Sequence, residues 1–483
     1  MELTLTRPKT TVSRAYKASA AVTLDGSLAD GEAAFSIASD AVADGFGEAA
    51  RDAVVGGISC AVLGLGIRRC GVSGVLRGGG EGRSGEANGA AGAADRRVAH
   101  GVCGLVAAEV FAAADRVRER TGDDVMVSVQ AVADVITAPV ESKLLGAARR
   151  KTHEVLRDAL AVGLELTANP GCVVGSNPVG DGVRRAFFGP AEVPSLGVRE
   201  HPRHGFFVEG AVELVARDAG DVERLVGAAL AGFEAEEAAA RDGHALSVGG
   251  AGGGAERVHC VLQVNVRRRS AGGGVYDADG TFLPDTETLS TVQVVDMAGV
   301  DRRKPTGVKT PRGTPRGNES GAAEDAALKA LSRVFDSLSD ARSHVPYRDS
   351  KLTRVMAASL GGRGRLTALV GVSSSALRFE ESDAMLQLAR KIAGVRSRPA
   401  PDATAYAARS AEAARTAAEA AEAAGVSLTG LTSAGVELDM DSSDELLALR
   451  DALAEGEALR REAGAWTEVK ERSDRLRRRV FGE

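Results

Sequence analysis

Apolar and polar residues follow two different spacings along this chain, and each spacing predicts a different kind of element. Residues 261–267 alternate between apolar and polar side chains, which is typical of a half-buried β-strand. Residues 289–296 and 366–372 are short, mainly apolar runs, which favours buried strands. Residues 327–338 instead place apolar side chains along one stripe of a helix. Strands that alternate with helices indicate a layered α/β domain.

Three segments between these elements have the composition of insertions, and the chain changes character near its C-terminal end. Residues 77–97 and 249–254 are rich in glycine, and residues 302–318 are basic and proline-containing. We therefore predict a domain over residues 1–398 that carries these insertions, and a neck or tail of two helices over residues 399–483. Apolar positions in the last helix slip in phase, so both a coiled coil that joins two copies and a helix packed on its own domain stay open.

Composition excludes several broad classes of protein. A net charge of −6 over 483 residues is not that of a nucleic-acid-binding polycation, so an acidic partner must meet a local basic patch. The five cysteines form no CxxC pair, so we expect neither a metal site nor a disulfide framework, and a reducing, intracellular compartment fits. No apolar run approaches the roughly 20 residues of a membrane span. The first 24 residues, basic and nearly free of acids, weakly imitate an organelle transit peptide.

The most specific part of the chain is the basic segment, residues 344–362, with the sequence HVPYRDSKLTRVMAASLGG. Its cations stand at helical spacing on one compact face, which suits an acidic protein surface but also an ordinary solvated helix. The whole stretch closely resembles the loop and helix with which kinesin motor domains contact tubulin. The resemblance implies that the microtubule is met by His344, Tyr347, Arg348, Lys351 and Arg354.

Residues 294–307, VVDMAGVDRRKPTG, resemble the kinesin switch II motif. In such a motif an aspartate at a strand end reaches bound Mg²⁺ through water, and the amide of a glycine three residues later approaches the γ-phosphate. The resemblance assigns these roles to Asp296 and Gly299. The acid two positions farther on, a glutamate in the family, is Asp301 here.

Lesser resemblances to the same family follow in the expected order from about residue 3 to residue 395. Among them, Arg7 and Pro8 resemble the end of the first kinesin strand and are assigned to the nucleotide site. Together the matches imply a kinesin-like P-loop NTPase fold, with a central mixed sheet and helices on both faces. They also imply ATP with Mg²⁺ as cofactor, microtubule-based movement as the family role, and a location in the cytoplasm on the microtubule cytoskeleton.

The phosphate-binding loop of this family reads GxxxxGK[ST], and the chain departs from it. The glycines let backbone amides approach the phosphates, the lysine bridges phosphate oxygens, and the hydroxyl binds Mg²⁺. We predict that the loop begins at Gly64, after an apolar strand, and contains Gly66. In this register Arg69 replaces the second glycine, Cys70 replaces the lysine and Gly71 replaces the hydroxyl residue. The sequence therefore predicts a weakened nucleotide site.

The switch I motif of the family, NxxSSRSH, is also incomplete. It falls on residues 253–259, GGAERVH, where Arg257 and His259 keep the arginine and the histidine but all the serines of the motif are replaced. Loss of the serines weakens the ordering of catalytic water and metal. Arg257 is expected to pair with Asp301, either to close a nucleotide site or as a structural ion pair between the two switches.

An intact basic segment beside two degraded phosphate loops leaves several explanations open. The chain is either an ATP-dependent kinesin motor or a non-motile adaptor that binds microtubules regardless of nucleotide, and only the first has a nucleotide-dependent affinity. A third explanation is an error of gene assembly near residues 64–97 and 249–256, with a true motor behind it. A fourth, an unrelated α/β protein, requires both specific segments to match by coincidence.

Overall fold

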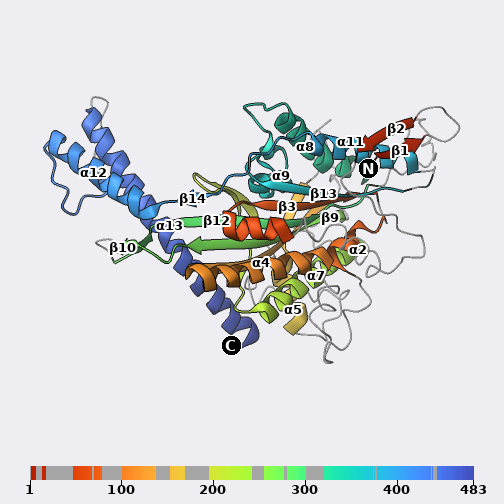
Figure 1. Cartoon of the computed structure of the whole chain (residues 1–483), viewed down its shortest axis with the longest axis horizontal. Helices are drawn as coiled ribbons and strands as arrows, with labels where there is room; N and C mark the ends of the chain where they lie inside the picture. The colour runs from red at the N-terminus through yellow and green to blue at the C-terminus, as the bar shows by residue number, and fades with distance from the viewer. Residues whose placement is uncertain are drawn as a thin grey trace, which may run out of the picture.

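The computed structural model shows a central sheet between two layers of helices, with a pair of helices that projects from one end (Figure 1). Arg7, Pro8, Arg69 and Asp301 lie outside the residues that the structure describes, as do nearly all of the predicted insertions. The described residues are 2–6, 13–17, 47–67, 70–78, 101–137, 153–168, 195–241, 255–276, 280–300, 320–373, 375, 378–436, 438 and 443–482.

The central sheet is mixed, as the sequence predicts. Its strands lie in the order β13, β3, β12, β9, β4, β5. The first three are parallel to one another, whereas β9, β4 and β5 continue the sheet by antiparallel pairing. The three strands predicted from the apolar patterns fall on β9, β12 and β13. The bounds are Cys60–Gly66 (β3), Asp124–Thr137 (β4), His153–Asp158 (β5), Ala255–Arg269 (β9), Glu287–Asp296 (β12) and Arg365–Gly371 (β13).

Short strands extend this sheet or form separate hairpins. β8 pairs with β4, and β14 pairs with β12. The hairpin of β6 and β7 contacts α9, so it borders the basic segment. The bounds are Glu2–Thr6 (β1), Ser13–Lys17 (β2), Gly197–His201 (β6), Gly205–Glu209 (β7), Leu214–Val215 (β8), Gly274–Tyr276 (β10), Phe282–Pro284 (β11) and Ala403–Thr404 (β14).

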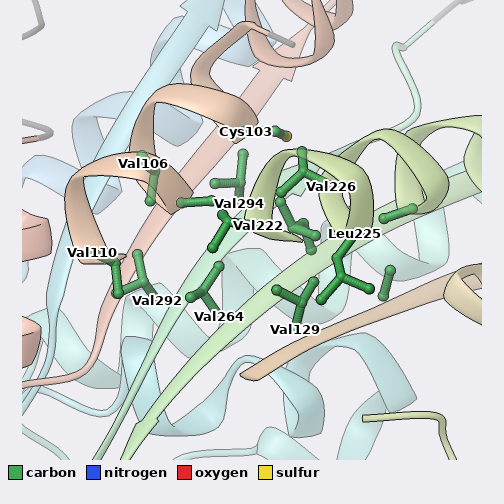
Figure 2. Packing of buried hydrophobic residues seen from close by; sticks show 14 of the residues in the cluster. Cys103, Val106, Val110, Val129, Val222, Leu225, Val226, Val264, Val292 and Val294 are labelled. Atoms are coloured by element: carbon green, nitrogen blue, oxygen red, sulfur yellow. The ribbon is translucent and has the colours of Figure 1, made fainter. Parts of the chain in front are cut away.

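One face of the sheet is covered by α2, α4, α5, α7 and the helix of residues 47–56. Figure 2 shows Val106 and Val110 of α4 and Leu225 and Val226 of α7 around Val264 of β9. All five are buried, and each such side chain contributes about 1.5–3 kcal/mol when it leaves water. The bounds are Val72–Arg77 (α2), Gly101–Thr121 (α4), Ala159–Ala168 (α5) and Ala219–Arg241 (α7).

The opposite face carries α8, α9, α10 and α11. Leu331 and Phe335 of α8 are fully buried with Leu352 of α9 against Val295 of the sheet, which confirms the helical stripe predicted over residues 327–338. Because successive strand residues point to opposite faces, the sheet supplies two separate cores. The bounds are Ser320–Ser339 (α8), Lys351–Val355 (α9), Ala357–Leu360 (α10) and Phe379–Ala393 (α11).

The last two helices, α12 (Tyr406–Ala424) and α13 (Asp444–Phe481), pack first on each other and then on the domain. The later part of α13 passes the edge of the sheet (Figure 1), where the fully buried Arg477 pairs with Asp221. Of the two alternatives for this helix, the structure shows packing on its own domain. A dimer through α13 and a domain boundary near residue 399 stay predictions. Among the described residues, no helix combines the length and the apolar character needed to cross a membrane.

Candidate functional site

The turn after β3 occupies the place of the phosphate-binding loop, but in a different register from the predicted one. β3 does not end before Gly64. It continues to Gly66, because β13 pairs with it in parallel as far as Gly371. α2 begins at Val72, and Gly71 before it has a φ of 87°, a left-handed conformation that glycine adopts without strain.

With the loop starting at Gly66, residues 66–73 read GIRRCGVS and match the motif at both glycines and at the hydroxyl. The hydroxyl belongs to Ser73, which sequence reasoning missed, and Val72 stands where the motif has lysine. Placing the start of the motif at each glycine of the GLG sequence, residues 64–66, and counting the matches would have found this register. This register gives other motif positions to Arg69, Cys70 and Gly71, whose contact with a nucleotide stays a prediction.

Cys70 closes this turn from within. Its N–H donates to the carbonyl of Ile67 at 3.2 Å, and the N–H of Ile67 donates to the carbonyl of Gly371 at 3.3 Å. The Cys70 sulfur lies so close to Gly66 and Gly371 that a Cβ on either glycine would overlap it. Burial raises the pKa of this thiol. The backbone N–H groups of Ile67 and Cys70 are thus already hydrogen-bonded within the chain. The Cys70 side chain fills the space beside the ends of β3 and β13.

The carboxylate of Asp296, at the end of β12, is held by side chains of α2. Arg77 forms an ion pair with it, and Ser73 Oγ donates to its Oδ1 at 3.1 Å. The exposed fractions of the Arg77 and Asp296 side chains are 9% and 4%, so the pair is nearly shielded from water. Burial raises the pKa of Asp296, and the guanidinium acts in the opposite direction. Arg77 also pairs with Glu237 of α7 at 2.7 Å.

The turn that follows Asp296 is docked on the neighbouring strands, and Gly299 lies within it. The donors and acceptors are Met297 N to Gly64 O (3.1 Å), Ala298 N to His259 Nδ1 (2.9 Å) and Val300 N to Gly66 O (2.9 Å). This turn therefore has one defined position on the ends of β3 and β9. Arg257 belongs to β9, but its side chain and Asp301 lie outside the described residues, so their pairing stays a prediction.

The described residues do not fit the magnesium nucleotide that the family resemblance implies. Ser73 and Asp296 do converge, as the metal-facing groups of a P-loop site should. However, the buried carboxylate already has a cation, because the Arg77 guanidinium faces it. Val72 has no charge with which to bridge phosphate oxygens. A divalent ion would have to displace the buried Arg77 guanidinium from Asp296 and leave it with Glu237 alone, which is costly.

The basic segment forms a short 3-10 helix, Tyr347–Asp349, followed by α9 and α10. Ser350 is the N-cap of α9, where its hydroxyl accepts from the N–H of Leu352 at 3.1 Å. Leu352, Val355 and Met356 are buried beneath the segment. The apolar residues between the cations therefore hold the segment on the sheet and leave its polar side outward.

The five side chains predicted to meet tubulin are not equally exposed. His344 and Arg348 are exposed, whereas Lys351 and Arg354 are half-buried. Tyr347 packs on the core beneath the segment, and burial raises its pKa to about 12. The structure thus exposes two of the four cations, buries the other two in part, and gives Tyr347 a packing contact.

Residues from other segments meet two of these cations. Arg348, with a side chain that is 77% exposed, pairs with Glu200 of β6. Lys351 Nζ donates to Ser195 Oγ at 3.2 Å, and its backbone N–H donates to Glu154 Oε2 at 2.5 Å. Exposed pairs of this kind contribute about 0–1 kcal/mol, so Arg348 can exchange its partner at little cost.

A buried polar contact ties the basic segment to the strand that ends at Asp296. Gln293 Nε2 donates to the carbonyl of Val355 at 2.8 Å, and Ser359 Oγ donates to Gln293 Oε1 at 2.9 Å. Gln293 and Asp296 belong to the same strand, β12. One rigid strand thus carries both the Arg77–Asp296 pair and the anchor of the basic segment.

Comparisons with known proteins agree on one family. The family model "Kinesin motor domain" matches residues 185–395, which include the basic segment but not the turn after β3. Kinesin-like protein 5 of Schizosaccharomyces pombe is 32% identical over 143 residues, 29% of this chain and 15% of that protein. Kinesin-like protein KIF18B of Homo sapiens is 29% identical over 204 residues, 42% of this chain and 21% of that protein. The chain therefore matches only a small part of the length of these relatives.

A solved structure supports the fold independently. It is described as "KIF14[391-772] dimer two-heads-bound state - AMP-PNP in complex with a microtubule". Its TM-score to this chain is 0.52 at 17% sequence identity, and the match covers 82% of this chain and 87% of that one. The identity is low, so the likeness concerns the fold. Residues 185–395 therefore resemble the kinesin motor domain family, and the chain has the fold of a kinesin motor domain.

Proposed function

We propose that this chain is a microtubule-binding member of the kinesin family that holds the microtubule without ATP-driven stepping. The basic segment makes the contact, with His344 and Arg348 as its most exposed members. Tubulin is the acidic partner that the family resemblance implies, and a compact cationic face attracts such a surface. The cytoplasmic microtubule cytoskeleton is the corresponding location.

The main support for the proposed absence of ATP-driven stepping is the Arg77–Asp296 ion pair. A kinesin motor needs the switch II region to change its contacts when nucleotide and metal bind and leave. Here the carboxylate that should respond to the metal has a permanent cation on its own chain. Because Val72 replaces the lysine, the turn also lacks the charge that would draw phosphate in.

Co-sedimentation of the purified chain with microtubules tests this proposal, in the presence of a non-hydrolysable ATP analogue, of ADP and of no nucleotide. We expect the same pelleted fraction in all three conditions, and weaker pelleting as salt rises because the contact is electrostatic. A pelleted fraction that depends on nucleotide would disprove it. Arg415→Ala, which removes an exposed cation of α12 far from the basic segment in sequence, is the matched control for loss of charge.

ATP-dependent movement, the family role, is the alternative, and one observation favours it. Gly66, Gly71 and Ser73 keep three positions of the phosphate-loop motif, and Ser73 lies on Asp296. Microtubule-stimulated ATP hydrolysis by the unmodified chain, lost in Ser73→Ala, would establish this alternative. We expect no stimulation.

A further inference from the structure

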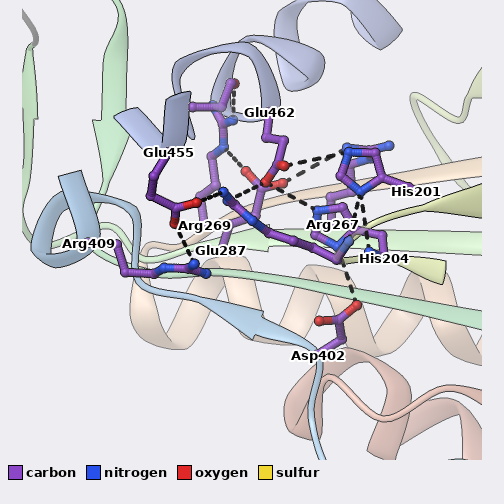
Figure 3. Close-up of polar contacts among 11 residues, drawn as sticks. His201, His204, Arg267, Arg269, Glu287, Asp402, Arg409, Glu455 and Glu462 are labelled. Atoms are coloured by element: carbon purple, nitrogen blue, oxygen red, sulfur yellow. Dashed lines mark hydrogen bonds and ion pairs between the residues drawn. The ribbon is translucent and has the colours of Figure 1, made fainter. Parts of the chain in front are cut away.

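Two histidines and a glutamate meet where the β6–β7 hairpin touches α13. His201 and His204 flank the turn of the hairpin, in the sequence HPRH, and Glu462 reaches them from α13 (Figure 3). His201 Nε2 lies 3.5 Å from Glu462 Oε1, and His204 Nε2 lies 3.7 Å from Glu462 Oε2. The two imidazole rings are stacked, with centroids 4.9 Å apart.

We propose that His201, His204 and Glu462 bind one transition-metal ion of the Zn²⁺ type and so fasten α13 to the hairpin. The ligand atoms of the three residues all lie within 4.8 Å of one another. In a tetrahedral zinc site with bonds of about 2.0–2.2 Å, neighbouring ligand atoms are roughly 3.3 Å apart. The widest of these separations therefore has to shorten by up to about 1.5 Å, which side-chain rotations supply, and water completes the shell.

The surroundings of the three residues favour an ion at this place. Asp402 Oδ2 lies 3.4 Å from His204 Nδ1, which is the carboxylate–histidine arrangement that orients metal-binding imidazoles and raises their basicity. The side chain of Glu462 is only 12% exposed, so its charge is poorly solvated.

Arg203, between the two histidines, takes part of the same carboxylate. Its guanidinium donates to Glu462 Oε2 at 2.8 Å and to Glu455 Oε2 at 2.7 Å. Glu455 shares this positive charge, and Oε1 of Glu462 remains directed at His201. Oε1 is therefore the Glu462 oxygen open to the ion, and His204, which now lies beside Oε2, must turn towards it.

The proposal has a local structural consequence. His201 Nδ1 now accepts from the backbone N–H groups of Arg203 and His204, both at 3.3 Å. A metal on Nε2 places the proton on Nδ1, which cannot accept. These two long contacts must open, while the hairpin as a whole becomes fixed to α13. Metal binding thus changes the hydrogen exchange of residues 197–209 and slows the exchange of α13 around Glu462.

Titration of the metal-free full chain with Zn²⁺ and Co²⁺ tests the proposal, by calorimetry and by the visible absorption of bound Co²⁺. We expect one equivalent of metal, loss of this binding in His204→Ala and Glu462→Gln, and about tenfold weaker binding in Asp402→Asn. His153→Ala, which removes a histidine of β5 outside this cluster, should bind the metal as the unmodified chain does. Cys70→Ser should also bind metal as the unmodified chain does. Loss of binding in this variant would assign the metal to the half-buried thiol and not to the proposed cluster.

Two outcomes would overturn the proposal. One is the absence of a one-equivalent binding event in the unmodified chain. The other is a Glu462→Gln chain that melts like the unmodified one and binds metal equally well. Glu462→Gln keeps the shape of the side chain, so a folding defect in His204→Ala does not leave the question open.

Discussion

The turn after β3 and the basic segment are both anchored on β12, yet one places its arginine in the interior and the other places its arginine at the surface. At the turn, Arg77 is directed inward and pairs with the buried Asp296. In the basic segment, Arg348 is directed outward and pairs with the exposed Glu200. A charge that is paired in the interior holds a structure in one state, whereas a charge paired at the surface remains available to a partner. The proposed function rests on this difference: Arg348 can still pair with a partner, whereas Arg77 holds the end of β12.

Arg77→Ala should have the largest effect, because it leaves the Asp296 carboxylate buried without its cation. We expect the free energy of unfolding to fall by about 3–5 kcal/mol, measured by urea denaturation. Arg415→Ala, an exposed arginine in α12, should change it by no more than about 0.5 kcal/mol. A loss below about 1 kcal/mol for Arg77→Ala would show that the pair does not lock the switch.

The same substitution should be sensitive to pH. The pKa of Asp296 is already raised by burial, and Arg77 limits the rise, so the pKa should rise further in Arg77→Ala. A folded state whose acid has a raised pKa binds the proton more tightly than the unfolded chain, so stability falls as pH rises. Denaturation at pH 5 and pH 8 should therefore show a larger deficit of the variant at pH 8. An equal loss of stability at both pH values would mean that the Asp296 carboxyl group does not cause the pH dependence.

Ser359→Ala should separate the basic segment from β12. It removes the donor to Gln293 Oε1, a buried acceptor, and should cost about 1–3 kcal/mol of stability. Microtubule binding should weaken as well, because the segment is then less firmly positioned. If binding were unchanged at a temperature where the variant remains folded, the anchor on β12 would have no role in presenting the segment.

Val72→Lys restores the missing lysine of the phosphate-loop motif. It tests whether the lost lysine or the Arg77–Asp296 pair prevents nucleotide binding at the turn after β3. With Arg77 in place, we expect no binding of a fluorescent ATP analogue. With Arg77→Leu added, we expect Mg²⁺-dependent binding at least tenfold tighter than in Arg77→Leu alone, about 1.4 kcal/mol. Binding by Val72→Lys alone would mean that the lysine, and not the Arg77–Asp296 pair, is the limiting feature.

The smallest effects should come from the exposed pair of Arg348 and Glu200. Arg348→Ala removes a cation from the binding surface and should weaken microtubule binding a few-fold. Glu200→Ala frees that cation and should strengthen binding by a similar factor, about 0.5–1 kcal/mol in each case. Co-sedimentation at low and high salt should show the difference shrinking as salt rises. Equal affinity of both variants would exclude Arg348 from the contact.

The local patterns of the sequence were sufficient for elements and for motifs that are continuous in the chain. Alternation over residues 261–267 predicted β9, and the stripe over residues 327–338 predicted α8. The structure favours a phosphate-loop register two residues later than the one that the sequence predicted, because the apolar run before Gly66 does not mark where the strand ends. Pairing with β13 decides that point, and Arg365–Gly371 lies some 300 residues away.

The sequence by itself determined the layered α/β fold, the basic segment and its family resemblance, because each depends on residues that are close along the chain. Only the tertiary structure decided which cation faces Asp296 and which histidines meet Glu462. Arg77 and Asp296, like Arg203 and Glu462, come from distant elements that the sheet and α13 bring together. Ion pairs and ligand clusters depend on distances in space, and spacing along the chain predicts those distances only within a single helix, strand or turn.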